Sequence, residues 1–236
     1  MGVTPEELAQ TYPRLYHMAD ARSWESIQKK GLLSTSSLLD LFEVMGHERE
    51  NIESRRRPES VPIVHEKYGR AVVRGNNPII ESKLRAALPK DFTLEQWYRL
   101  LNKHAFFWLT SERLKTLLCA RAYRDYPHAV LTLDTLRFVR RYEQKIVLSP
   151  MNSGNTQPIA HPRSPETFKK MCDYPFQERA HRGNYYQIVE LAVEGGADVT
   201  ESVLSVDLMQ CAGDGMRVLH NMYESGGTGE HTTRTR

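Results

Sequence analysis

Residues 184–193 read Asn-Tyr-Tyr-Gln-Ile-Val-Glu-Leu-Ala-Val, and this segment decides the predicted fold. Its β-branched and aromatic side chains predict a strand. In a strand Glu190 shares a face with Ile188 and Ala192, so its carboxylate is expected in apolar surroundings. Such a position costs free energy unless the carboxylate is paired or used, which makes Glu190 a candidate functional residue. The alternatives are an edge-strand acid that faces water and a partner for a nearby arginine.

A turn and a second apolar segment follow this strand. Gly195 and Gly196 favour a turn, and residues 203–208 predict another strand. The two strands are therefore expected to form a hairpin. Residues 224–236 contain no apolar side chain and are expected to be a disordered tail.

The N-terminal part predicts a strand followed by a short helix. Residues 15–17 are strand-like, and Trp24 and Ile27 lie three residues apart on a helix that ends at Gly31. A strand that ends in His17, followed by a loop and a helix with a glycine exit, can expose backbone amides and an imidazole to a ligand. The alternative is that His17 is a hydrogen-bonded core histidine.

Three consecutive arginines, Arg55, Arg56 and Arg57, lie near the end of a very polar stretch at residues 46–58. Arginine offers paired donors that match the geometry of phosphate oxygens, so this cluster can hold a diphosphate. The alternative is a solvated run of charges.

The remaining pattern mixes the two element types without regular alternation, which predicts an α+β fold rather than a doubly wound sheet. Further strands are expected at 61–64, where Pro62 indicates an edge, and at 105–109, 130–133 and 146–148. Helices are expected at 36–45, capped by Ser36, and at 79–88, 94–101, 111–118 and 137–141, and residues 151–165 are expected to be a loop. Neither the glycine-rich dinucleotide fingerprint nor the phosphate-loop motif is present.

The composition indicates one globular domain at residues 1–223. The chain has 236 residues, of which 40% are hydrophobic and 26% are charged. No apolar run approaches the length that spans a bilayer, so no membrane association and a cytoplasmic location are expected. The formal charge of +3 permits contact with phosphate-rich partners but is small for a dedicated nucleic-acid binder.

The cysteines and histidines show no paired motif. Cys119, Cys172 and Cys211 are far apart and odd in number, so neither a disulfide framework nor a zinc site is expected, and a reducing compartment fits best. The nine histidines are equally scattered, and no metal is expected.

Three segments, in this order, resemble the ADP-ribosyltransferase superfamily and, within it, the DarT group of DNA-modifying toxins. They are Tyr16-His17 with the helix from Ile27 to Gly31-Leu32, then Ile52-x-x-Arg55-Arg56, and finally Gln187-x-x-Glu190-Leu191-x-Val193. The match covers about residues 13–64 and 184–208, with a looser correspondence at 105–108. The sequence departs from the group after His17, where it has Met18-Ala19-Asp20 instead of a threonine and a second histidine.

The resemblance implies a fold, a substrate and roles for particular residues. The fold is a split β-sheet core with flanking helices, and the co-substrate is NAD. The resemblance assigns catalysis to Glu190 and Arg56, with Arg56 favoured over Arg55. It assigns NAD binding to His17, Met18, Ala19, Ile27, Gly31, Leu32 and Arg55, with Phe107 or Trp108 against the nicotinamide.

The implied activity is NAD-dependent ADP-ribosyl transfer. The nicotinamide–ribose bond breaks, and ADP-ribose passes to an acceptor, which the resemblance places among DNA or RNA bases. The resemblance also implies a biological role as a toxin or phage-defence effector. An antitoxin or regulatory protein is then the implied partner. Arg137, Arg140 and Arg141 are compatible with contact to a phosphate backbone. The alternatives are an RNA 2′-phosphotransferase and a non-catalytic binding or scaffold protein of the same fold.

Overall fold

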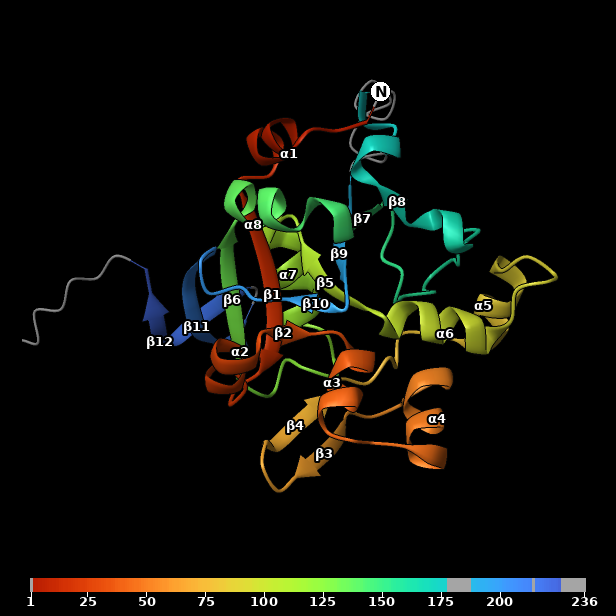
Figure 1. Ribbon diagram of the computed structural model, residues 1–236, viewed down its shortest axis with the longest axis horizontal. Helices are drawn as coiled ribbons and strands as arrows, with labels where there is room; N and C mark the ends of the chain where they lie inside the picture. Colours follow the sequence, from red (N-terminus) through yellow and green to blue (C-terminus); the bar gives the residue numbers. More distant parts are fainter. Residues whose placement is uncertain (1, 178–187, 214, 226–236) are drawn as a thin grey trace, which may run out of the picture.

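The computed structural model describes residues 2–177, 188–213 and 215–225, and it is an α+β fold. An eight-stranded sheet forms its centre, and helices pack on both faces of this sheet (Figure 1). In the described part of the chain, no helix has the length and apolar character needed to cross a bilayer.

The helices are α1 (Pro5–Thr11), α2 (Trp24–Lys30), α3 (Thr35–Leu41), α4 (Gly46–Ser54), α5 (Glu81–Ala87), α6 (Leu94–Asn102), α7 (Ser111–Leu118) and α8 (Thr135–Tyr142). Short 3-10 helices are η1 (Glu143–Lys145), η2 (Pro165–Thr167) and η3 (Met171–Asp173). The strands are β1 (Arg14–Asp20), β2 (Leu32–Leu33), β3 (Val61–His65), β4 (Gly69–Val73), β5 (His104–Trp108), β6 (His128–Asp134), β7 (Ile146–Ser149), β8 (Lys169–Lys170), β9 (Glu190–Glu194), β10 (Gly196–Ala197), β11 (Val203–Ala212) and β12 (Gly215–Glu224).

The main sheet has the strand order β12-β11-β6-β1-β5-β9-β7-β8, and all of its neighbouring pairs are antiparallel. β1 pairs with β6 along its whole length. By contrast, among the described residues β1 and β5 meet at one pair, Tyr16 opposite Trp108. The two halves of the sheet are thus joined at the centre by a short contact.

The predicted hairpin between 185–193 and 203–208 is wrong. β9 pairs with β5 and β7, whereas β11 pairs with β6 and β12, so the two strands are not neighbours. The first residues of the predicted strand, 185–187, lie outside the described residues. Gly196, with φ of +101°, starts β10 and pairs with Leu33, and a Cβ at this position would collide with the β2 backbone. Gly196 therefore permits the close approach of two backbone segments, β10 and β2, and does not form a hairpin turn.

The end of the chain contributes one more strand than the sequence predicts. β12 is paired with β11 as far as Glu224, so the tail expected from residue 224 starts later than predicted. Residues 226–236, which hold the rest of that predicted tail, lie outside the described residues.

A small lobe of α3, α4 and the β3–β4 hairpin lies below the main sheet in Figure 1. The polar stretch at 46–58 is mostly helical here, because Ile52 of α4 is buried against α3 and β3 while charged residues cover the outside. Arg49 and Arg99 form ion pairs with Glu53 on this lobe. Ser34, not Ser36, caps α3. The edge position predicted for the strand with Pro62 is confirmed, since β3 pairs with β4 alone in a two-stranded sheet.

The main sheet separates two apolar layers, which fixes the direction of its side chains. Leu15, Phe107 and Leu131 point into the larger core, which contains Phe138 of α8. Met18 and Val130 point to the other face, where they pack with α7. Since side chains alternate along a strand, Tyr16 and Trp108 belong to the α7 face.

The expectation of no disulfide is wrong, because Cys119 and Cys211 are bonded to each other. Cys119 ends α7, and Cys211 lies in β11, 92 residues later. The helix packs across the sheet and brings the two Cα atoms to 5.1 Å, within the usual range for a disulfide. The spacing of Cys119 and Cys211 along the chain does not predict that they lie close together in the fold. The bond also removes the support that unpaired cysteines gave to a reducing compartment.

Candidate functional site

A row of residues crosses the centre of the sheet and carries the candidate acid. The Cα pairing places Tyr16 opposite Trp108, and Trp108 opposite Glu190. Ser149 of β7 lies on the far side of Glu190. Directly opposed residues share a face, and two strand spacings put the Cα atoms of Tyr16 and Glu190 about 10 Å apart. The rings of Tyr16 and Trp108 are half-buried, so partly accessible aromatic surface lies beside the acid.

The carboxyl of Glu190 is buried, as the sequence predicts, with only 4% of the residue exposed. Its Oε2 accepts a hydrogen bond of 3.0 Å from the backbone N–H of Ser153. Burial raises the pKa of Glu190 to about 7, although hydrogen bonds from Ser153 and the positive charges of Arg113 and Arg163 lower it. Burial therefore outweighs four influences that lower the pKa: two hydrogen bonds from Ser153 and the charges of Arg113 and Arg163.

A carboxyl with this pKa exchanges its proton near neutrality. It can accept a proton from a reacting hydroxyl or amine, and its ionised form can stabilise a positive charge that develops beside it. Its burial, raised pKa and specific polar partners make Glu190 a candidate functional residue.

His17 lies on β1 next to this row but on the other face of the strand. Its Nδ1 lies 2.8 Å from the carbonyl oxygen of Phe106 on β5, so the imidazole spans the two strands near their short contact. Burial lowers the pKa of His17 to about 4, and the charge of Arg74 lowers it further, against the hydrogen bond to Phe106. His17 is therefore neutral at physiological pH.

Arg74, directly after β4, is a residue that the sequence analysis missed. Its guanidinium carbon lies 4.9 Å from the ring centre of Tyr123. Burial lowers the pKa of Arg74, and its charge acts on both His17 and His128. The guanidinium donates no hydrogen bond to any other described residue, which leaves its donors available to an anion. The sequence signal, a lone arginine after a strand, is too common to be recognised.

Arg55 and Arg57 have different surroundings. Arg57 is buried and has a structural role: it donates to the carbonyls of Ile52 and Arg74 and to Asn102 Oδ1. Arg55 is exposed and acts electrostatically on the acids of α4 and α6, Glu50 and Glu95. Among the described residues, no interaction joins either arginine to Glu190.

Arg56 is held by the segment that follows Arg74. Its Nε donates to the Ile79 carbonyl at 2.8 Å, and its Nη2 donates to Asn77 Oδ1 at 2.6 Å. The next backbone N–H, that of Ile80, donates to Thr156 Oγ1 at 2.7 Å. Thr156 is three residues from Ser153, a span of at most about 11 Å. Arg56 is thus connected, through the 151–156 loop, to the contact on Glu190, but no hydrogen bond or ion pair between described residues links the two directly.

The remaining predicted NAD contacts are mostly core residues. Met18, Ala19, Ile27 and Leu32 are buried in the two apolar layers, so their side chains serve the core. Gly31 has a φ of +83° and ends α2 as predicted.

The two candidate aromatic residues point in opposite directions. Phe107 is 1% exposed and packs on Phe138, with ring centres 4.8 Å apart. Trp108 is half-buried on the same face as Glu190. Of the two, Trp108 is therefore the ring available beside the acid.

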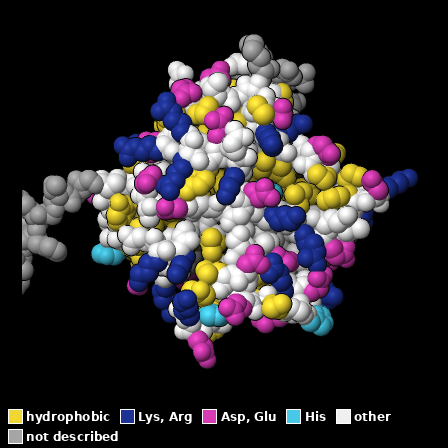
Figure 2. All heavy atoms as spheres, in the orientation of Figure 1, with side chains coloured by type: hydrophobic (Ala, Val, Ile, Leu, Met, Phe, Trp, Pro, Cys, Tyr) yellow, Lys and Arg dark blue, Asp and Glu magenta, His cyan; other side chains and the backbone are white. Residues whose placement is uncertain are grey.

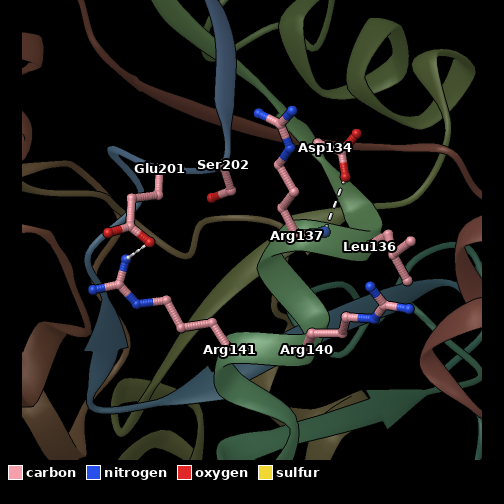
Figure 3. Close-up of a pocket in the computed structure, with 7 residues that line it drawn as sticks. All are labelled: Asp134, Leu136, Arg137, Arg140, Arg141, Glu201 and Ser202. Carbon is pink, nitrogen blue, oxygen red and sulfur yellow. Dashed lines mark hydrogen bonds and ion pairs between the residues drawn. The ribbon is translucent and has the colours of Figure 1, made fainter.

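A hollow of about 950 Å³ lies elsewhere, on α8. Figure 3 shows the arginines that line it, Arg137, Arg140 and Arg141, with side chains directed apart. Arg140 pairs with Glu6 at 2.8 Å, and Arg141 pairs with Glu201 at 2.8 Å. Because these charges are largely balanced and none of the hollow's lining residues touches Glu190, this hollow is a poor candidate for either catalysis or phosphate binding.

The visible surface has the same mixed character. Figure 2 shows Lys and Arg side chains interleaved with Asp and Glu across this face. A strongly basic stripe, which typifies dedicated nucleic-acid binders, is not seen on the described residues of this face.

Comparison with known protein families identifies the family of this chain. A family model described as a family of unknown function (DUF7002) matches residues 13–204, which include the centre of the sheet, Arg74 and Glu190. No curated protein matches the chain.

Proposed function

The chain belongs to the DUF7002 family, whose function is unknown, and from the chemistry of its central site we propose that it is an NAD-dependent ADP-ribosyltransferase. The buried Glu190, with its pKa near 7 at the short β1–β5 contact, carries this proposal. The two sheet halves joined at that contact are consistent with the split sheet of that superfamily. The order of the three sequence segments adds independent support.

In the proposed reaction the bond between nicotinamide and the ribose carbon breaks, and the electron pair leaves with nicotinamide. The ribose carbon becomes cationic. The ionised Glu190 stabilises this charge, and the partly accessible ring of Trp108 offers a surface on which the nicotinamide can stack.

The acceptor then attacks the ribose carbon, and its proton passes to the Glu190 carboxylate. A pKa of about 7 suits this step, because the group is partly ionised before the reaction and holds the proton afterwards. The positive charge of the nicotinamide ring of NAD, placed beside Glu190, favours the ionised form of its carboxyl. His17 is neutral and tied to the Phe106 carbonyl, so we assign it to binding and not to proton transfer.

We assign the diphosphate of NAD to Arg74 in place of Arg55. Arg74 donates no side-chain hydrogen bond to another described residue, and its charge acts on His17 and is felt by one acid, Asp20, whereas Arg55 acts on the acids Glu50 and Glu95 of α4 and α6. Arg56 remains the proposed second catalytic residue, since its segment is bonded to the loop that contacts Glu190. A nucleic-acid base is the proposed acceptor, and a role as a toxin or phage-defence effector follows from the resemblance alone.

Nicotinamide release from NAD is the direct test. The purified full chain is incubated with NAD alone, with single-stranded DNA and with RNA, and the expected result is nicotinamide release together with a nucleic acid that carries ADP-ribose. Release that depends on RNA with an internal 2′-phosphate would show the phosphotransferase instead. If no nicotinamide is released under any of these conditions, the result would favour a binding or scaffold protein.

Arg74→Gln is expected to raise the KM for NAD about tenfold to a hundredfold, because a hydrogen bond to a charged group contributes about 1.5–3 kcal/mol. The kcat should change less, since the diphosphate does not react. Arg70→Gln, an exposed arginine on the same hairpin, is the matched control. An unchanged KM in Arg74→Gln would remove the diphosphate from this position.

A further inference from the structure

We propose that Arg163 is a positioning residue for Glu190: it fixes the 151–163 loop so that Ser153 holds the carboxylate from above the sheet. Its meaning for catalysis rests on the proposed function, but its effect on the carboxylate does not. Arg163 is not expected to touch the substrate.

All three guanidinium nitrogens of Arg163 are used within its own loop. Nε donates to the carbonyl of His161 at 3.1 Å, Nη1 to that of Ser153 at 3.0 Å, and Nη2 to that of Asn155 at 3.1 Å. Only 3% of Arg163 is exposed. A buried charge that bonds three carbonyls of one loop is costly to place, and its effect is to determine that loop's shape.

The loop is also fixed from outside. The backbone N–H of Arg163 donates to the Ala87 carbonyl at 2.9 Å, and its guanidinium carbon lies 5.7 Å from the ring centre of Trp97. Further along, Thr156 Oγ1 accepts from the Ile80 N–H. The loop is therefore anchored to α5 at Arg163 and, in its middle, to the segment before α5 at Thr156, and the Arg163 guanidinium bonds the carbonyls of Ser153 and Asn155, which precede Thr156.

This geometry acts on one atom of the acid. Ser153 accepts a hydrogen bond from Arg163 Nη1 at its carbonyl oxygen. The backbone N–H of Ser153 donates to Glu190 Oε2 at 3.0 Å. Arg163 makes no hydrogen bond to Glu190 among the described residues, so it acts through Ser153 and through its charge. Both effects favour the ionised carboxylate, and both are expected to weaken when a neutral side chain replaces Arg163.

The test is a titration of the Glu190 carboxyl by carbon NMR in the full chain, with glutamate labelled and the signal assigned by its loss in Glu190→Gln. Arg163→Met is expected to raise the titration midpoint by about one pH unit or more. Arg163→Lys keeps the charge but not the three bonds, and an intermediate midpoint is expected. Arg85→Met is the matched control, because Arg85 also donates to loop carbonyls but lies in α5 and acts on the 89–92 turn.

A folded Arg163→Met protein with the midpoint of the parent would overturn the proposal. If that variant does not fold, the parent protein is measured instead. The amide resonance of Ser153 must then titrate with the same midpoint as Glu190. An amide that does not respond contradicts the hydrogen bond from Ser153 to Glu190, through which Arg163 is proposed to act. The titration needs no NAD and is therefore independent of activity. If the parent releases no nicotinamide, the proposed function is refuted, but a shifted midpoint in Arg163→Met still supports this inference. Where activity exists, its acidic limb should move to higher pH in Arg163→Met, with turnover recovering at pH 9.

Discussion

Glu190→Gln is expected to reduce nicotinamide release about a hundredfold to a thousandfold at pH 8, the loss typical for removal of one well-placed electrostatic group. Glutamine has almost the same shape and can still accept the Ser153 hydrogen bond. What it lacks is the negative charge that stabilises the cationic ribose carbon and the site that accepts the acceptor's proton. The reduction should therefore appear mainly in kcat, measured with the KM for NAD on the same preparations.

Glu194→Gln is the control for this comparison, because Glu194 lies on the same strand with an exposed side chain. It should keep the parent's turnover. The parent's rate should rise with pH through about 7, as Glu190 ionises. Equal turnover in Glu190→Gln and the parent would remove Glu190 from the reaction and, with it, the proposed chemistry.

Glu190→Gln is also expected to be more stable than the parent at pH 8, by up to about 3 kcal/mol. In the folded parent the pKa of Glu190 is about 7, whereas the ordinary pKa of a glutamate, which we take for the unfolded chain, is 4.5. Between these values the unfolded chain has lost the proton and the folded chain still holds it, so the parent's stability falls as pH rises from about 4.5 to 7. Glutamine has no such proton, and the difference between the two proteins should therefore grow through this window and then stay constant.

The stability of Glu190→Gln must be compared with that of the parent at each pH, because His17 also makes the stability of the parent depend on pH. The pKa of His17 is lowered from 6.5 to about 4, so in that range the unfolded chain binds the extra proton and stability rises with pH. This slope opposes that of Glu190 in the parent, but it is common to both proteins and cancels in their difference. Urea unfolding at pH 4, 6 and 8 would measure that difference, with Glu194→Gln as the control. Parallel curves for the parent and Glu190→Gln would mean that the folded protein does not raise the acid's pKa.

Local patterns in the sequence were sufficient to predict many helices and strands and the burial of Glu190. The strand at 15–17, the helix that ends at Gly31 and the strand at 105–109 are confirmed as β1, α2 and β5. The burial of Glu190 is confirmed as well. These features depend on the order of apolar, polar and glycine residues within a few positions, which a sequence records directly.

Helix ends and short polar helices were harder to predict. Ser34 caps α3 in place of Ser36, since either serine can accept the capping bond and only the direction of the incoming chain selects one. The helix at 46–54 carries few apolar residues, and it forms because the packing of Ile52 and ion pairs to α6 stabilise it. Such tertiary support is absent from any local pattern.

The sequence by itself determined the mixed α+β character, the position of most strands and the identity of the buried acid. Tertiary structure alone decided that β9 lies between β5 and β7, that Cys119 meets Cys211, that the charge of Arg74 acts on His17, and that the charge of Arg163 acts on Glu190. The physical reason is separation along the chain: Ser153 and Glu190 are joined by a hydrogen bond across 37 residues, and partners so distant are chosen by the packing of the whole sheet.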